Sequence, residues 1–89
     1  MDAATVRMII ASFINGDPSQ FEKSEQRDAV RWLEQRAYLT PPDKGTHPAH
    51  HPQIGKTADA LKEAIFSWDR GDKDGAKRFA EEAAKHLGA

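Results

Sequence analysis

Residues 70–82 read RGDKDGAKRFAEE, and this stretch decides how the C-terminal half of the chain folds. Gly71 can adopt the left-handed conformation that ends many helices. Asp72 or Asp74 can then accept hydrogen bonds from the free backbone amides at the start of the next helix. The stretch therefore predicts a tight bend between two helices.

A calcium loop is the alternative interpretation, because an EF-hand places ligands at positions 1, 3, 5 and 12 and glycine at position 6. With Gly75 at position 6, Arg70 occupies position 1, where the metal needs a carboxylate. A cation at that point opposes metal binding, so the bend is favoured. The acidic residues that do match the loop are Asp72, Asp74 and Glu81.

Apolar residues at three- and four-residue spacing predict helices on both sides of this bend, at about residues 57–69 and 74–87. Thr57 is the expected N-cap of the first. Alanines on the second would let the two helices approach closely. The two stripes comprise Ala58, Leu61, Ile65 and Trp68, then Ala76, Phe79, Ala80, Ala83 and Leu87.

The N-terminal half carries the same helical spacing and predicts helices at about residues 3–15 and 18–39. Gly16 ends the first helix, and Asp17 followed by Pro18 is a typical helix start, although the start could fall as late as residue 24. The apolar positions are Val6, Ile9, Ile10 and Phe13, then Ala29, Val30, Leu33 and Ala37.

Between the two halves, residues 40–56 hold four of the five prolines and three of the four histidines, which is typical of a loop or linker. The sequence thus predicts an all-α fold. We expect one small domain, residues 1–89, with four helices arranged as two helical hairpins joined by this Pro/His-rich loop.

Composition limits the possible functions. The 13 Lys and Arg residues balance 14 Asp and Glu residues, giving a formal charge of −1, so no global field favours nucleic acid or an acidic membrane. The absence of cysteine excludes disulfides, thiolate zinc sites and cysteine nucleophiles. The N-terminus does not follow the pattern of a secretory signal, and no apolar run is long enough to span a bilayer. We expect a cytoplasmic protein.

Two local patterns suggest ligands but are incomplete. His47, His50 and His51, with Asp43 nearby, have ligand chemistry suited to zinc, yet the prolines among them do not set a helical spacing. The triplet GKT at residues 55–57 matches the end of a phosphate-binding loop but lacks its first glycine and preceding strand. We therefore expect neither a metal nor a cofactor.

Catalytic patterns are also missing, so we expect a protein that is not an enzyme. The large apolar residues outnumber those that two hairpins readily bury, which favours a small regulatory or inhibitory protein that binds another protein, either as a monomer or as a homodimer. Such chains are common among accessory proteins of bacteria and their mobile elements. Aromatic and arginine residues dominate interface energies. The candidate partner-binding residues are Trp32, Arg36, Tyr38 and Phe66.

Nucleic-acid binding is the alternative function. Lys23, Arg27 and Arg31 lie four residues apart and form a basic stripe on the second predicted helix. Acidic residues surround this stripe, and paired charges at helical spacing more often mark a solvated surface. Nucleic acid is therefore the less favoured partner.

Overall fold

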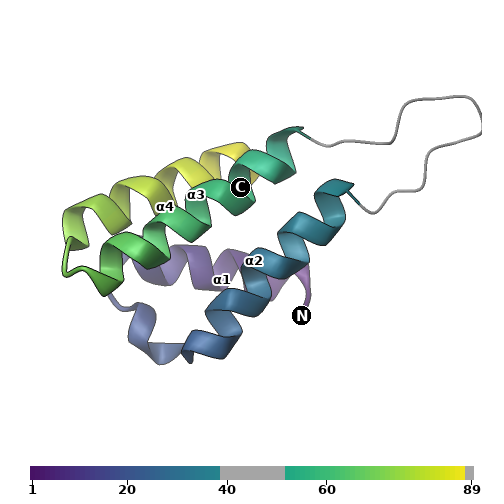
Figure 1. The fold of residues 1–89 in the computed structure, drawn as a ribbon. Helices are drawn as coiled ribbons and strands as arrows, with labels where there is room; N and C mark the ends of the chain where they lie inside the picture. The colour runs from purple at the N-terminus through teal and green to yellow at the C-terminus, as the bar shows by residue number, and fades with distance from the viewer. Residues whose placement is uncertain (39–51, 88–89) are drawn as a thin grey trace, which may run out of the picture.

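The computed structural model describes residues 1–38 and 52–87 of the chain. Within them the chain forms four α-helices (Figure 1), namely α1 (Ala3–Ile14), α2 (Lys23–Tyr38), α3 (Pro52–Asp69) and α4 (Lys73–Leu87). A short 3₁₀ turn, η1 (Pro18–Gln20), joins α1 to α2. The described ranges contain no strand, so the predicted all-α class is confirmed.

The second helix begins later than residue 18, at the late end of the expected range. Pro18 opens η1, and the extended backbone of Phe21 then turns the chain. Helix α2 starts after this turn, where the Glu25 carboxylate accepts a hydrogen bond of 3.0 Å from the backbone N–H of Glu22. The buried Gln26 side chain fixes the turn, because its amide donates to the carbonyls of Pro18 and Phe21 at 3.1 and 3.2 Å.

The third helix begins earlier than predicted, at Pro52 and not at Thr57. Proline suits the first position of a helix because its missing N–H would have no partner there. Thr57 is therefore buried inside α3 and is not its N-cap. The 55–57 triplet is helical, so it cannot form the loop that a phosphate site needs.

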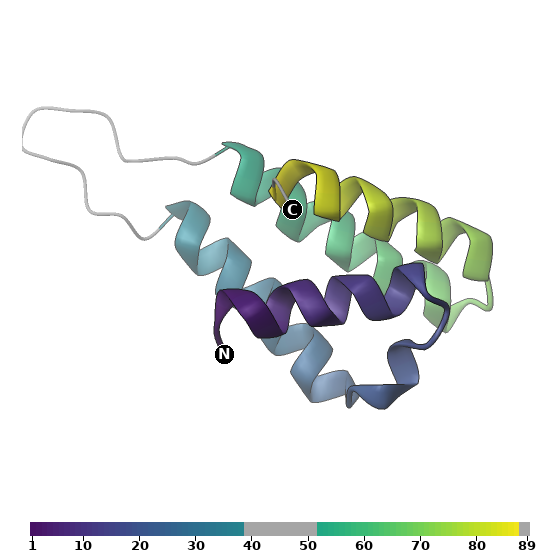
Figure 2. The same ribbon diagram turned by 180° about the vertical axis from the view of Figure 1, so that it is seen from behind.

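Helices α3 and α4 pack against each other along their length as an antiparallel hairpin, visible in Figures 1 and 2. Helix α2 packs on α3, and α1 packs on α4. Helices α1 and α2 touch little. The expected pairing of the first two helices as a packed hairpin is therefore not confirmed, and the α3/α4 hairpin is the central element of the bundle.

The core is built from the predicted apolar stripes. Alanines on α4 leave room for α3 to approach closely. Phe13 is fully buried, and its ring meets Trp68 edge to face, with centroids 6.3 Å apart and planes at 87°. The buried apolar residues include Val6, Ile9, Ile10, Ala29, Val30, Leu33, Ala58, Leu61, Ala64, Ile65, Ala76, Ala80 and Ala83.

The bend of residues 70–82 is confirmed. Gly71 has a φ of 83°, and its N–H donates to the Trp68 carbonyl at 3.0 Å. The Asp72 carboxylate then accepts from the Gly75 N–H at 3.0 Å, which caps α4. Gly71 and Asp72 thus serve the local structure of a helical hairpin.

Candidate functional site

Trp32 and Arg36 lie together on α2. The guanidinium carbon of Arg36 stands 4.5 Å from the centroid of the Trp32 ring, a cation–π contact. The Trp32 ring is half-buried and packs against the hydrophobic core. Part of its apolar surface is therefore already used in folding. Tyr38, also predicted for this set, has a side chain outside the described part of the structure.

Phe66 is the large aromatic residue that α3 presents to solvent, with 54% of its surface exposed. It lines a groove of about 410 Å³ between α2 and α3. We call this the α2/α3 groove. Its other lining residues are Arg27, Val30, Lys62, Ile65 and Asp69.

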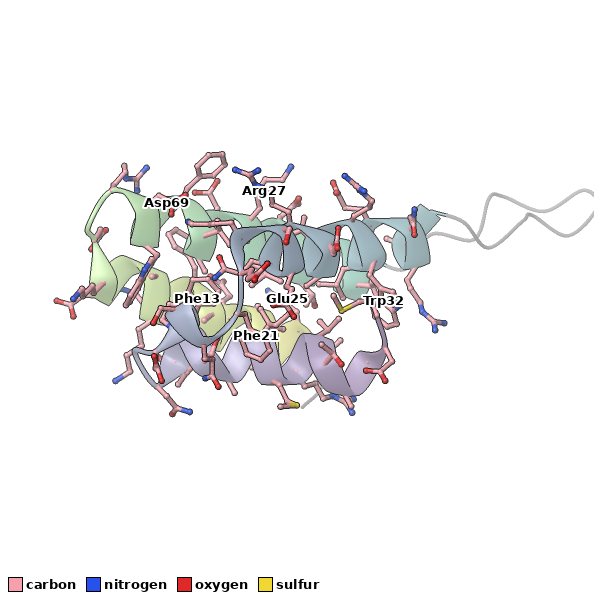
Figure 3. The ribbon with its side chains drawn as sticks, turned by 90° about the horizontal axis from the view of Figure 1, so that it is seen from below. Phe13, Phe21, Glu25, Arg27, Trp32 and Asp69 are labelled. Carbon is pink, nitrogen blue, oxygen red and sulfur yellow. The ribbon has the colours of Figure 1, made fainter. Side chains whose placement is uncertain are left out.

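The structure separates Trp32 from Phe66. Figure 3 shows Arg27 and Asp69, which line the α2/α3 groove with Phe66, along one edge of the molecule. Trp32 lies in the space between α2 and α1. Arg27 and Trp32 are five residues apart, so they point about 140° from each other around α2. The predicted partner-binding residues therefore do not form one patch, and Phe66 shares its groove with Arg27 of the basic stripe.

Two ion pairs tie α2 to α3 beside the groove. Lys23 pairs with Asp69, and the Lys62 Nζ lies 3.9 Å from a carboxylate oxygen of Glu34. All four side chains are partly exposed, so each pair contributes little to stability. Asp69 therefore already compensates the first cation of the predicted basic stripe.

The other two cations of the basic stripe, Arg31 and Arg27, differ in their contacts with carboxylates. A guanidinium nitrogen of Arg31 lies 4.0 Å from a carboxylate oxygen of Asp28, at the limit of an ion pair. Arg27 has no ion pair among the described residues. Arg27 thus stands in the groove beside an exposed aromatic ring, without an ion pair to any part of the chain that the structure describes.

The predicted histidine cluster, His47, His50 and His51 with Asp43, lies outside the described residues. Within residues 1–38 and 52–87, no group of three or more histidine, aspartate or glutamate side chains could hold a metal ion.

A second groove, of about 290 Å³, lies between α1 and α4. We call it the α1/α4 groove. Its lining is apolar except for one charged residue, and it consists of Arg7, Ile10, Ala11, Ile14, Ala84 and Leu87. The α1/α4 groove was not predicted from the sequence, because α1 was expected to pair with α2.

A repeat in the sequence could have indicated this groove. SFINGD at residues 12–17 and SWDRGD at residues 67–72 match at the serine, the aromatic position, the glycine and the aspartate, 55 residues apart. At the same spacing of 55 residues, the α1 residues that line the α1/α4 groove correspond to the α3 residues that line the α2/α3 groove. These pairs are Arg7 with Lys62, Ile10 with Ile65, Ala11 with Phe66, and Ile14 with Asp69.

No protein-family model, curated protein or solved structure matches this chain. None of the described helices is long and apolar enough to cross a membrane. Because no known protein matches, the geometry of the two grooves is the basis for inferring a function.

Proposed function

We propose that this protein is a small, non-enzymatic regulatory or inhibitory module that binds another protein through the α2/α3 groove. The observation that carries the proposal is the position of Phe66, which leaves 54% of its surface in water beside Arg27. Exposed aromatic area forfeits hydrophobic free energy unless a partner covers it.

The surroundings of Phe66 suit a protein partner. Val30 and Ile65 supply an apolar floor, and the ion pairs Lys23–Asp69 and Lys62–Glu34 stand near the groove as a polar rim. An aromatic anchor within a polar rim is the usual anatomy of a protein interface. Arg27 adds a cation that has no ion pair within residues 1–38 and 52–87, so the partner should place a carboxylate opposite it.

The alternative, nucleic-acid binding by Lys23, Arg27 and Arg31, draws less support from the same contacts. Asp69 neutralises Lys23, and Asp28 stands next to Arg31. Phosphate binding depends on net positive potential. The proposed function also includes a cytoplasmic location for this protein, where it would meet its protein partner.

The proposal is tested by affinity capture from cell extract with the wild type, Phe66→Ala and Met8→Ala. Met8 is the matched control, because it is 59% exposed and lies on α1, outside both grooves. We expect Phe66→Ala to lose a captured protein that Met8→Ala retains, with unchanged thermal unfolding for both variants.

Salt dependence separates the two functions. Capture of a protein through an apolar anchor should change little with salt, whereas phosphate contacts should weaken steeply as salt rises. If Phe66→Ala and wild type capture the same proteins, the proposal is wrong. Binding to a DNA duplex that Arg27→Glu with Arg31→Glu abolishes would support the alternative.

A further inference from the structure

The α1/α4 groove plays no part in the proposed function, yet its chemistry is specific. Its wall and floor are aliphatic, from Ile10, Ala11 and Ile14 on α1 and from α4. Its single charged residue, Arg7, has no ion pair with any described residue. A matching ligand should therefore carry a bulky apolar group with a carboxylate close to it.

The repeat indicates which apolar group the groove lacks. Under the 55-residue shift, Ile10 corresponds to Ile65 and Ala11 corresponds to Phe66. The α2/α3 groove therefore contains an aromatic ring at the position where the α1/α4 groove has only a methyl group. A phenyl ring supplied from outside would occupy space that Ala11 leaves open.

Helix α3 of this chain presents the required pair of groups. Phe66 is 54% exposed, and Glu63 lies three residues before it. Residues three apart are neighbours on a helix surface. Glu63 is exposed and forms no ion pair among residues 1–38 and 52–87. Helix α3 thus displays an apolar ring together with a carboxylate that is exposed and has no ion pair to another described residue.

We propose that the α1/α4 groove of one copy binds Phe66 of a second copy, with Glu63 of that copy paired to Arg7. The ring gains apolar contacts with Ile10 and Ile14, and the ion pair fixes the direction of the incoming helix. This inference rests on Phe66 being a binding residue, as in the proposed function. The proposed occupant of the α1/α4 groove is a second copy of the chain.

The two surfaces lie on opposite faces of the molecule. Helices α2 and α3 face the viewer in Figure 1, and α1 and α4 face the viewer after the half-turn of Figure 2. The association is therefore head to tail, and it grows into a ring or a chain of copies. A two-fold dimer through the α2/α3 groove is disfavoured, because it would bring two uncompensated Arg27 side chains together.

Sedimentation velocity of the full chain over a roughly hundredfold range of concentration tests this, since association follows mass action. We expect wild type to exceed the monomer mass as concentration rises. Phe66→Ala removes the ring, and Ala11→Phe fills the groove, so each variant alone should stay monomeric. Both positions are exposed, and circular dichroism should confirm that each variant is folded.

Mixing these two variants is the decisive experiment. The Phe66→Ala chain keeps an intact groove, and the Ala11→Phe chain keeps an intact ring. A head-to-tail contact predicts that the mixture forms a one-to-one dimer and nothing larger. A two-fold contact predicts that the mixture forms no such dimer. If no dimer forms in the mixture, the inference is wrong.

The ion pair has its own test. Arg7→Glu should weaken wild-type association by at least about tenfold, because it places two carboxylates together. Adding Glu63→Arg to the same chain should restore association. Met8→Ala, one residue from Arg7 but outside the groove, should associate like wild type. Failure of the charge exchange to restore association would exclude the proposed pairing.

The outcome is separable from that of the proposed function. A wild type that stays monomeric at every concentration overturns the inference, whether or not Phe66→Ala still loses its captured protein. Conversely, the two variants could each stay monomeric and form a one-to-one dimer when mixed, while Phe66→Ala captures the same proteins as wild type. That combination would support the inference and contradict the proposed function. The Ala11→Phe chain retains Phe66, so it should still capture the partner protein.

Discussion

The turns after α1 and α3 begin identically and end differently. In SFINGD the Asp17 N–H donates to the Ser12 carbonyl at 2.8 Å, and in SWDRGD the Asp72 N–H donates to the Ser67 carbonyl at 2.8 Å. Each glycine has a positive φ, 77° at Gly16 and 83°. Both are Schellman ends, which satisfy the last carbonyls of a helix.

The difference lies after the aspartate. Asp72 caps α4 at once, so α3 and α4 form a tight hairpin. Asp17 makes no such cap, and Pro18 opens η1 before α2 begins at Lys23. The longer connection lets α1 lie on α4 while α2 lies on α3. A local change after the same helix end therefore decides whether two consecutive helices pair.

The largest expected effect comes from breaking the aromatic pair that joins the two turns. Phe13 is 1% exposed, so Phe13→Ala should cost about 3–5 kcal/mol of unfolding free energy through lost burial and a cavity. Trp68 is only half-buried, so Trp68→Ala should cost less. Urea unfolding followed by circular dichroism measures both. Phe13→Leu keeps most of the apolar volume and provides a folded variant if Phe13→Ala unfolds. Equal losses at the two positions would contradict this asymmetry.

The glycines test whether the two helix ends are equivalent. An added Cβ at Gly16 or Gly71 would meet no atom within 4 Å, so strain from the positive φ is the sole expected cost. Gly16→Ala and Gly71→Ala should each lower stability by about 1–2 kcal/mol. The same urea experiment measures them. A markedly larger loss at one glycine would show that the two ends are not equivalent.

The aspartates test the point at which the turns diverge. Asp72→Ala removes the cap on the Gly75 N–H and should cost about 1 kcal/mol. Asp17 accepts from the exposed Ser19 hydroxyl at 3.2 Å and caps no backbone amide of η1. Asp17→Ala should therefore cost less than about 0.5 kcal/mol. Equal costs, measured by thermal unfolding, would mean that the cap does not distinguish the turns.

The smallest effect concerns the start of α1. Asp2 accepts from the Thr5 N–H at 2.8 Å, and this bond lowers the pKa of Asp2 from its ordinary value of 3.8. A lowered pKa in the folded state means that the cap stabilises α1 above pH 3.8 and that this contribution is lost as the pH falls through the lowered pKa. The equivalent position in α3 is Thr57, inside the helix.

An NMR titration of the Thr5 amide should show the loss of this cap as a shift in acid. Asp2→Asn, which can cap without titrating, is the control and should leave the Thr5 amide shift nearly independent of pH. A Thr5 amide that titrates alike in both chains would contradict the assignment.

Much of this architecture could be predicted because it depends on neighbours in sequence. Helical periodicity placed Val6, Ile9 and Phe13 in the core, and the glycines marked the helix ends. The start of α3 was misplaced because Thr57 resembles an N-cap, whereas Pro52 offers an equally suitable start five residues earlier. For the site, the sequence identified Phe66 and Arg27 as surface candidates but assigned them to different functions.

Local patterns in the sequence were enough to predict the helical class, the apolar stripe of each helix, the bend at Gly71 and a cap at Asp72 or Asp74. These features follow from hydrogen bonds and side-chain spacing within a few residues. The choice of Asp72 as the cap, the packing of α1 on α4, the groove that Phe66 and Arg27 share, and the separate position of Trp32 became visible in the folded chain. The physical reason is that an apolar stripe specifies which face of a helix is buried but not which helix covers it. That choice depends on the direction the chain takes after Asp17.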